Sequence, residues 1–228
     1  MQLILRSFLV CCICIVLLLC ANCAPNINGG FQVKKGFHYS NKTTVEWGHN
    51  SEKEWSVLVT LSAEAATYDC TSTTSYSCED SAWVYDWNKL WGKARCGYLH
   101  GHHEDSDRFV WRRCSDASCT AYDGTPKIQI AGYSYDNGVA PYTGEKPQLL
   151  PVFNSTISPD VPYKYTMLMD ETGLTTFTLS TAEGAFIEAV TVQHDNLCEK
   201  DYFEGTVQGL YFGGTCAAPV TVVAVYKS

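Results

Sequence analysis

Residues 91–136 read WGKARCGYLHGHHEDSDRFVWRRCSDASCTAYDGTPKIQIAGYSYD. Within this stretch Phe109 and Trp111 alternate with other residues, and Ile128 and Ile130 do the same. A period of two is typical of a β-strand that buries one of its faces. The stretch therefore predicts two strands whose Phe, Trp and Ile side chains point into a core.

The same alternation recurs along most of the chain, and Gly-containing turns such as Asp123-Gly124 and Asn137-Gly138 separate the segments. The expected strands cover residues 55–61, 108–112, 128–135, 163–169, 175–179, 188–194, 205–212 and 220–226. Many short strands at close spacing predict an all-β, two-sheet β-sandwich of the jelly-roll type. One segment, residues 80–90, reads equally well as helix, loop or strand.

Residues 1–23 have the features of a signal peptide. Arg6 precedes an apolar run from Phe8 to Cys20, which is too short to span a membrane comfortably. We therefore expect a secreted, extracellular protein. Its mature part, residues 24–228, is expected to form a single disulfide-bonded β-jelly-roll domain, because about 200 residues suffice for one well-buried core.

The balance of charge limits the partners. The formal net charge of the chain is −8, and removal of residues 1–23 with Arg6 makes it −9. Such a protein repels nucleic acid and anionic membranes, so we expect it to bind neither. We expect a monomer that needs no cofactor.

Seven cysteines lie beyond the signal peptide, and export makes most of them candidates for disulfides. They are Cys70, Cys78, Cys96, Cys114, Cys119, Cys198 and Cys216. Pairs of Cys70 with Cys78, Cys114 with Cys119, and Cys198 with Cys216 are plausible, although spacing does not determine the connectivity. The number is odd, and retention of Cys23 would make it even. Asn41 and Asn154 begin N-glycosylation sequons and are expected on exposed loops.

Basic residues are concentrated in the opening stretch, which needs a reason in an acidic protein. If Phe109 and Trp111 face the core, neighbouring positions face the other side of the sheet. The residues expected on that solvent-facing side are Arg108, Arg112, Gln129, Tyr133 and Tyr135. Together with Lys93 and Arg95 they are candidates to bind an anionic substrate in a groove. A salt-bridged surface sheet is the alternative explanation.

Several short motifs suggest a family. They are Lys93-Ala-Arg95, Arg108-Phe-Val-Trp111-Arg112, Tyr133-Ser-Tyr135, Leu210-Tyr-Phe-Gly-Gly214 and Ala218-Pro219. Their order resembles the concanavalin A-like jelly rolls of the lectin/glucanase and polysaccharide-lyase families, and most of all the alginate and glucuronan lyases. The Gly-Lys-Leu-Pro-Gly strand of those lyases is absent, and residues 92–97 stand in its place.

The resemblance implies a polysaccharide lyase that cleaves a uronate-containing polysaccharide by β-elimination. This reaction needs a group that neutralises the carboxylate, a base for the C5 proton and an acid for the leaving O4. Tyr133 and Tyr135 are the candidates for base and acid, since residues two apart on a strand point the same way. His100 is the second candidate for the base.

Other functions remain open. The residues that could ligate a metal are His100, His102, His103, Glu104, Asp105 and Asp107. They are consecutive in an expected loop and not brought together from several elements, so we expect no metal site. A glucanase-like hydrolase needs two flanking carboxylates, for which there is no strand motif. The alternatives to a lyase are therefore a non-catalytic lectin-like or cell-wall-binding protein, a hydrolase of this kind, and a secreted structural or interaction protein.

Overall fold

The structure is a computed structural model. It describes residues 29–41, 46–50, 52–69, 87–97, 101–114, 119, 123–198, 202–213 and 217–227. Residues 1–23, Cys70, Cys78, His100 and Cys216 lie outside these ranges, so the predictions that concern them stay predictions.

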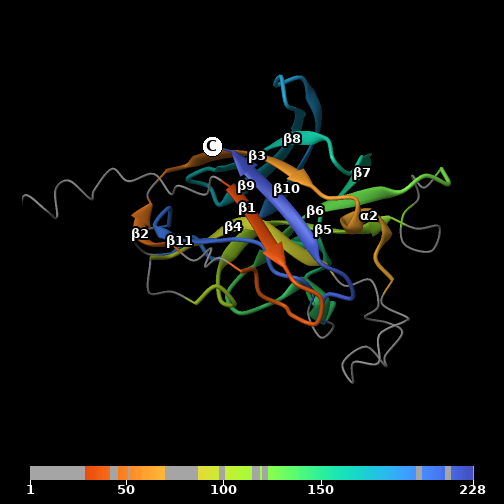
Figure 1. Cartoon of the computed structure of the whole chain (residues 1–228). Helices are drawn as coiled ribbons and strands as arrows, with labels where there is room; N and C mark the ends of the chain where they lie inside the picture. The colour runs from red at the N-terminus through yellow and green to blue at the C-terminus, as the bar shows by residue number, and fades with distance from the viewer. Residues whose placement is uncertain are drawn as a thin grey trace, which may run out of the picture.

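Two antiparallel six-stranded sheets pack against each other (Figure 1). Sheet A has the order β1 (Gly29–Val33), β12 (Val222–Lys227), β3 (Glu54–Leu61), β8 (Pro162–Met169), β9 (Leu174–Thr181) and β10 (Phe186–Gln193). Sheet B has the order β2 (Glu46–Asn50), β11 (Gly205–Gln208), β4 (Asn88–Ala94), β5 (Ser106–Cys114), β6 (Lys127–Tyr135) and β7 (Val152–Ile157). The predicted all-β sandwich is confirmed.

Helical structure is sparse in the described part of the chain. It consists of the short helix α2 (Glu64–Thr67) and the 3₁₀ turns η2 (Pro141–Thr143) and η3 (Pro147–Leu149). Residues 88–90 of the ambiguous segment belong to β4. No helix in the described ranges combines the length and the apolar character that a membrane crossing needs.

Alternation determines which side of each strand faces the core. On β3, Trp55, Val57, Val59 and Leu61 are buried, while the residues between them are exposed or half-buried.

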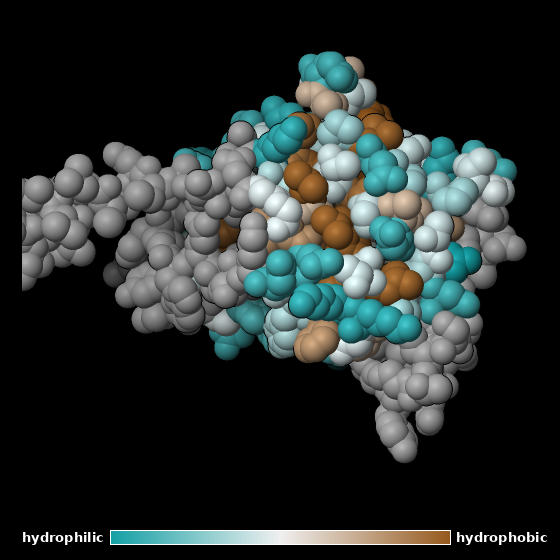
Figure 2. All heavy atoms as spheres, viewed as in Figure 1, coloured by the Kyte–Doolittle hydropathy of each residue, from teal (hydrophilic) through white to brown (hydrophobic). Residues whose placement is uncertain are grey.

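The sharp hairpin from β8 to β9 uses Gly173 at φ 81°, a backbone conformation that glycine adopts without strain. The outward side of sheet A mixes apolar and hydrophilic residues (Figure 2).

The core between the sheets contains the four residues that the alternation assigns to it, which are Phe109, Trp111, Ile128 and Ile130. The ring of Phe109 on β5 lies 5.1 Å from that of Tyr165 on β8 and 5.1 Å from that of Phe177 on β9. Both contacts are edge-to-face, which is a favourable geometry for aromatic pairs. The predicted inward face is therefore confirmed, and it connects the two sheets.

Two disulfides lie in the described part of the chain. Cys114 is bound to Cys119, as predicted. The prediction for Cys198 was wrong, because this residue is bound to Cys96 rather than to Cys216. The Cys96–Cys198 bridge joins positions 102 residues apart, from the end of β4 to the segment after β10. Nothing local in the sequence indicates a pairing at that distance.

Asn41 and Asn154 are both exposed. Asn154 lies on strand β7 rather than on the loop expected for a glycosylation site. Its side-chain amide donates a hydrogen bond of 3.1 Å to Glu188. The expectation of a loop was therefore wrong for this sequon, and glycosylation stays a prediction.

Gly132 provides a test of the core. It lies opposite Phe109 on β6, and a Cβ atom there would be 2.7 Å from the ring of Phe177. We expect Gly132→Ala to lower the free energy of unfolding by about 1–3 kcal/mol, because the ring has to move within a packed core. Unfolding in urea measures the change.

Gly30→Ala is the matched control, since no atom lies within 4 Å of a Cβ at that strand position. Its effect should stay within about 0.5 kcal/mol. Equal losses in the two variants would show that packing against Phe177 is not the cause.

Candidate functional site

The candidate site lies on the side of sheet B that faces away from the core, here called the outer face. Arg108 is directly opposite Tyr133, and Arg112 is directly opposite Gln129. Directly opposed residues of antiparallel strands project to the same side. Tyr135 also lies on this side, because it is two residues from Tyr133 on β6. The structure thus brings together five of the predicted site residues.

Four of these side chains are buried and Arg112 is half-buried, which corrects the expectation of an open surface. The exposed fractions are 6% for Arg108, 7% for Gln129, 3% for Tyr133 and 7% for Tyr135. A second apolar cluster surrounds them. Its members are Trp87, Val110, Ala131, Tyr133, Tyr135 and Ala140, with Leu150 packed against it. Strand alternation does not reveal that the segments around residues 87, 140 and 150 return over this face.

Two cations lie over the tyrosine rings. The Nζ atom of Lys89 is 4.6 Å from the centroid of the Tyr133 ring, and the Cζ atom of Arg108 is 6.0 Å from that of Tyr135. The two tyrosine rings are themselves 5.7 Å apart. Both cations are within the range of cation–π attraction. The outer face therefore places two positive charges beside two phenols.

Lys89 was missed by the sequence analysis. It lies at the start of β4, next to an irregularity in register between Lys89 and Trp91. Such a bulge shifts the side on which later residues project, so simple alternation fails here. The available signal was the position of Lys89 between Trp87 and Trp91 in the sequence. The structure shows that Trp91 packs in the core between the sheets, whereas Trp87 packs on the outer face.

Arg108 is a buried cation with few partners. Its Nη2 donates to the main-chain oxygen of His102 at 2.9 Å, while its Nε has no hydrogen-bond partner among the described atoms. Burial lowers the pKa of Arg108 to about 10, against the opposing influence of Tyr135, Tyr133 and Asp107. The guanidinium is therefore still charged at neutral pH. A buried, charged guanidinium that is only partly hydrogen-bonded is a natural site for an anion.

Arg112 has a more complete environment. Its Nε donates to Gln129 Oε1 at 2.8 Å, and its Cζ lies 4.3 Å over the ring of Trp87. These contacts orient the arginine along the outer face. Arg112 and Gln129 therefore form one end of the candidate site, and Arg108 lies toward the other.

Two histidines border the site near Tyr135. The rings of His102 and His103 are 4.1 Å apart, and that of His103 is 5.3 Å from Tyr135. Burial and the nearby charge of Arg108 lower the pKa of His102 to about 4 and also lower that of His103. Both imidazoles are therefore neutral at physiological pH, and the lowered pKa makes His102 a weak base. His100, the predicted alternative base, lies outside the described residues.

Lys93 and Arg95 are not part of the outer face. Lys93 is opposite Asp107 in the register and is fully buried, with its Nζ 4.6 Å from the ring of Trp55. It donates a hydrogen bond to the main-chain oxygen of Phe203. Burial lowers the pKa of Lys93 to about 7, although Glu52 and Glu204 oppose this. The structure thus separates these two predicted substrate contacts from Arg108.

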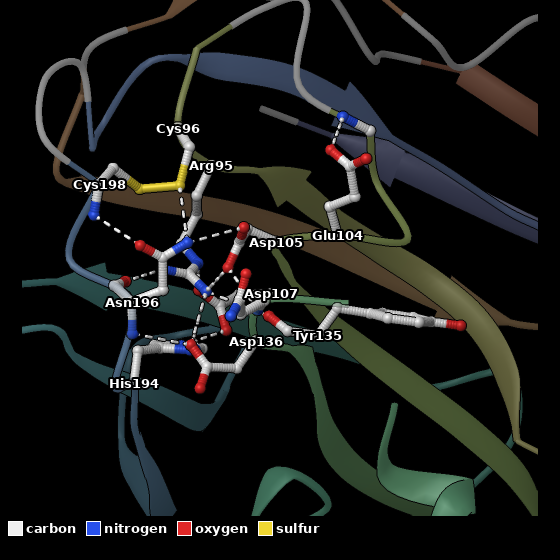
Figure 3. Close-up of a disulfide and its surroundings, with 12 residues drawn as sticks. Arg95, Cys96, Glu104, Asp105, Asp107, Tyr135, Asp136, His194, Asn196 and Cys198 are labelled. Atoms are coloured by element: carbon white, nitrogen blue, oxygen red, sulfur yellow. Dashed lines mark hydrogen bonds and ion pairs between the residues drawn. A yellow bond between two sulfur atoms is a disulfide. The ribbon is translucent and has the colours of Figure 1, made fainter. Parts of the chain in front are cut away.

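Arg95 instead lies at the centre of a buried polar cluster at the end of the core (Figure 3). Its Nη2 is 3.2 Å from Asp105 Oδ1, and its Nε is 3.2 Å from Asp107 Oδ2. Its Nη2 also donates to the main-chain oxygen of Tyr135 at 3.1 Å and lies 2.8 Å from His194 Nδ1. The guanidinium, which follows β4, therefore connects to the last residue of β6 and to the segment that follows β10.

Asp107 is the second key member of this cluster. Its carboxylate lies 2.9 Å from His194 Nε2 and accepts hydrogen bonds from Ser134 and Thr175. Burial by itself would raise the pKa of Asp107, but His194 and Arg95 outweigh burial and lower the pKa to about 2. Burial likewise opposes the protonated form of His194, and the neighbouring Asp107 raises the pKa of this histidine. The charges of the cluster thus stabilise one another.

The described residues among those considered as metal ligands do not converge. Asp105 and Asp107 lie inside with Arg95, while His102 and His103 border the outer face. Glu104 is exposed and accepts a hydrogen bond from the main chain of Gly101. In the described ranges no three His, Cys, Asp or Glu residues are grouped so that they could hold a metal ion.

Comparison with known proteins gives little further guidance. No protein-family model matches the chain, and no curated protein matches it. A crystal structure of a protein of unknown function from Shewanella oneidensis MR-1 is similar over 88% of this chain and 74% of that chain. The sequence identity is 12% and the TM-score is 0.36. This similarity does not bear on the function.

The buried cluster predicts a specific dependence of stability on pH. The pKa of Asp107 is lowered to about 2 in the folded protein from an ordinary value of 3.8. Its contribution is therefore complete above pH 3.8 and is lost as the pH falls toward 2. The loss should amount to roughly 2 kcal/mol in the free energy of unfolding. Asp107→Asn should remove this part of the acid dependence and should also destabilise the protein at pH 7.

Urea unfolding at a series of pH values between 7 and 2 measures the effect. Asp160→Asn is the matched control, because Asp160 is exposed and asparagine tolerates its φ of 60°. The control should retain the acid dependence of the wild type. If Asp107→Asn also retained it, the buried carboxylate would not be its source.

Proposed function

We propose that the outer face of sheet B binds an anionic, uronate-containing polysaccharide and cleaves it by β-elimination. The observation that carries the proposal is the environment of Arg108. This buried guanidinium has no carboxylate partner among the described residues and lies opposite Tyr133 and beside Tyr135. A uronate carboxylate is an anion of the size and geometry that such a guanidinium binds.

The proposed reaction uses groups on both sides of the two phenols. Arg108 and Lys89 neutralise the substrate carboxylate and stabilise the negative charge that develops when the C5 proton leaves. Tyr135 gives its phenolic proton to the neutral imidazole of His103 beside it and takes the C5 proton in its place. The C4–O4 bond then breaks, a C4=C5 double bond forms, and Tyr133 protonates the departing O4.

Access to the phenols requires movement of the side chains above them. Lys89 is half-buried and its Nζ donates a hydrogen bond to the main-chain oxygen of Trp87 at 2.9 Å, while His103 is exposed. A bound polymer would have to shift both side chains toward solvent. The small exposed fractions of Tyr133 and Tyr135 instead favour the second candidate, a lectin-like protein that binds the polysaccharide without cleaving it. A hydrolase is less well supported, because the outward positions of β5 and β6 hold no Asp or Glu.

The proposal includes export. The Cys96–Cys198 and Cys114–Cys119 bridges are compatible with an extracellular protein, since disulfides persist in oxidising compartments. Residues 1–23 would direct the chain there, and Asn41 and Asn154 would carry glycans. The resemblance to concanavalin A-like lyases provides the substrate class to be tested first.

The first experiment incubates the purified protein with alginate, glucuronan and related polyuronates and follows the ultraviolet absorbance of the unsaturated product. We expect Tyr135→Phe to lower the rate at least about 100-fold, because the phenol that transfers the proton is lost, while polymer binding is retained. Tyr163→Phe is the matched control on sheet A and should keep its activity.

Full activity of Tyr135→Phe would exclude this tyrosine as the base. Binding of a polyuronate by the wild type without any unsaturated product would favour the lectin-like function. A wild type that neither cleaves nor binds any member of the panel would overturn the proposal.

Lys89 is tested separately by affinity electrophoresis in gels that contain the polymer. We expect Lys89→Ala to weaken binding roughly tenfold, since one charge-assisted contact to the carboxylate is lost. Lys164→Ala is the matched control, because this lysine is exposed on the opposite sheet. Identical mobilities of the two variants would remove Lys89 from the proposed site.

A further inference from the structure

An exposed aromatic group lies at one edge of the outer face. Tyr39 is 75% exposed, and its ring packs edge-to-face on that of Tyr211 at 5.1 Å. The imidazole of His38 is also stacked on Tyr211, at 5.5 Å. A single exposed aromatic residue is ordinary, but an exposed ring that packs on a half-buried one is a candidate binding surface.

This aromatic group belongs to the same row of residues as Lys89. Tyr39 is bridged to Tyr211, and Tyr211 is bridged to Lys89, in both cases antiparallel. Directly opposed residues project to the same side. The side chain of Lys89 lies over Tyr133, so Tyr211 and Tyr39 extend the outer face outward by two strand positions. Each step is about 4.8 Å, so the row lengthens the face by roughly 10 Å.

The segment that carries Tyr39 has the charge that an anionic polymer requires. Residues 34–39 read KKGFHY, with two exposed lysines and the 62% exposed Phe37 in a chain of net charge −8. No acidic residue interrupts this run. Positive charge interleaved with exposed aromatic rings combines attraction for anions with flat surfaces for stacking.

The segment is also held in place by its backbone. Gly36 N donates to Ala218 O at 2.8 Å, and Ala218 N donates to Phe37 O at 3.0 Å. Phe212 N donates to His38 O at 2.9 Å. These hydrogen bonds fix the segment to Phe212 and Ala218. A preorganised surface loses less conformational entropy when it binds a ligand.

We propose that Tyr39, supported by Tyr211, forms an outlying subsite that stacks on a sugar ring of the same anionic polysaccharide whose reacting unit lies at Arg108. This inference rests on the proposed function and extends it from one sugar to a longer chain. Lys34 and Lys35 attract the carboxylates of the flanking units. The protein therefore prefers long chains to short ones.

The experiment compares Tyr39→Ala with Phe186→Ala, a matched control in which a 69% exposed aromatic residue is removed from β10 of the other sheet. Binding of short and long alginate and glucuronan oligosaccharides is measured by titration calorimetry. We expect Tyr39→Ala to weaken binding of the long oligosaccharides about three- to tenfold, the size of one aromatic contact. Binding of the short ones should not change.

Different outcomes separate the two proposals. If Lys89→Ala weakens binding but Tyr39→Ala behaves like Phe186→Ala, the subsite is wrong and the proposed function stands. If the wild type binds no oligosaccharide of either length, both are overturned. A change in sedimentation on Tyr39→Ala, with sugar binding intact, would make the aromatic group a contact between two copies of the chain and would also overturn the subsite.

Discussion

The arrangement of this sandwich depends on the buried ion pair between Arg95 and Asp107. Both side chains are fully buried, where an unpaired charge would cost several kcal/mol. Asp107 belongs to sheet B and is bonded to Thr175 of sheet A, while Arg95 reaches the segment after β10 through His194. The pair and its partners therefore close one end of the core with polar groups of balanced charge, in place of apolar packing.

The same pair determines which side chains reach the outer face. Because Asp107 points inward, its neighbour Arg108 must point outward on β5. Ser134 points inward to bond Asp107, so Tyr133 and Tyr135 point outward on β6. The hydrogen bond from Arg95 to the main-chain oxygen of Tyr135 fixes that strand from behind. The candidate site is thus held in position by the buried cluster on the other side of the sheet.

The sequence predicts the strands well where apolar residues alternate, because burial is then a local property of the pattern. This is why Phe109, Trp111, Ile128 and Ile130 are correctly assigned to the core. The same reasoning fails for Lys93, because a lysine is expected at the surface. Nothing in the neighbouring sequence indicates that its Nζ lies over the ring of Trp55.

The remaining failures have a common origin in contacts between distant segments. The Cys96–Cys198 bridge spans 102 residues, and Asp107 meets His194 across 87. Trp87 precedes β4 in the sequence and Leu150 follows β6, and both belong to the apolar cluster around the two tyrosines. The outer face is therefore more enclosed than alternation implies. A strand pattern indicates which way a side chain points, but it contains no information about what returns to cover it.

Arg95 and Arg108 show how the two faces of one sheet give the same residue type different roles. Arg95 is surrounded by Asp105, Asp107 and His194, so its charge is balanced within the protein and its role is structural. The Nε atoms of Arg95 and Arg108 both lack a hydrogen-bond partner in the described part of the chain, but Arg108 has no ion pair there and its described hydrogen bond is to a neutral main-chain oxygen. The desolvation of Arg108 is therefore only partly compensated by the protein, and an anionic ligand would complete the compensation.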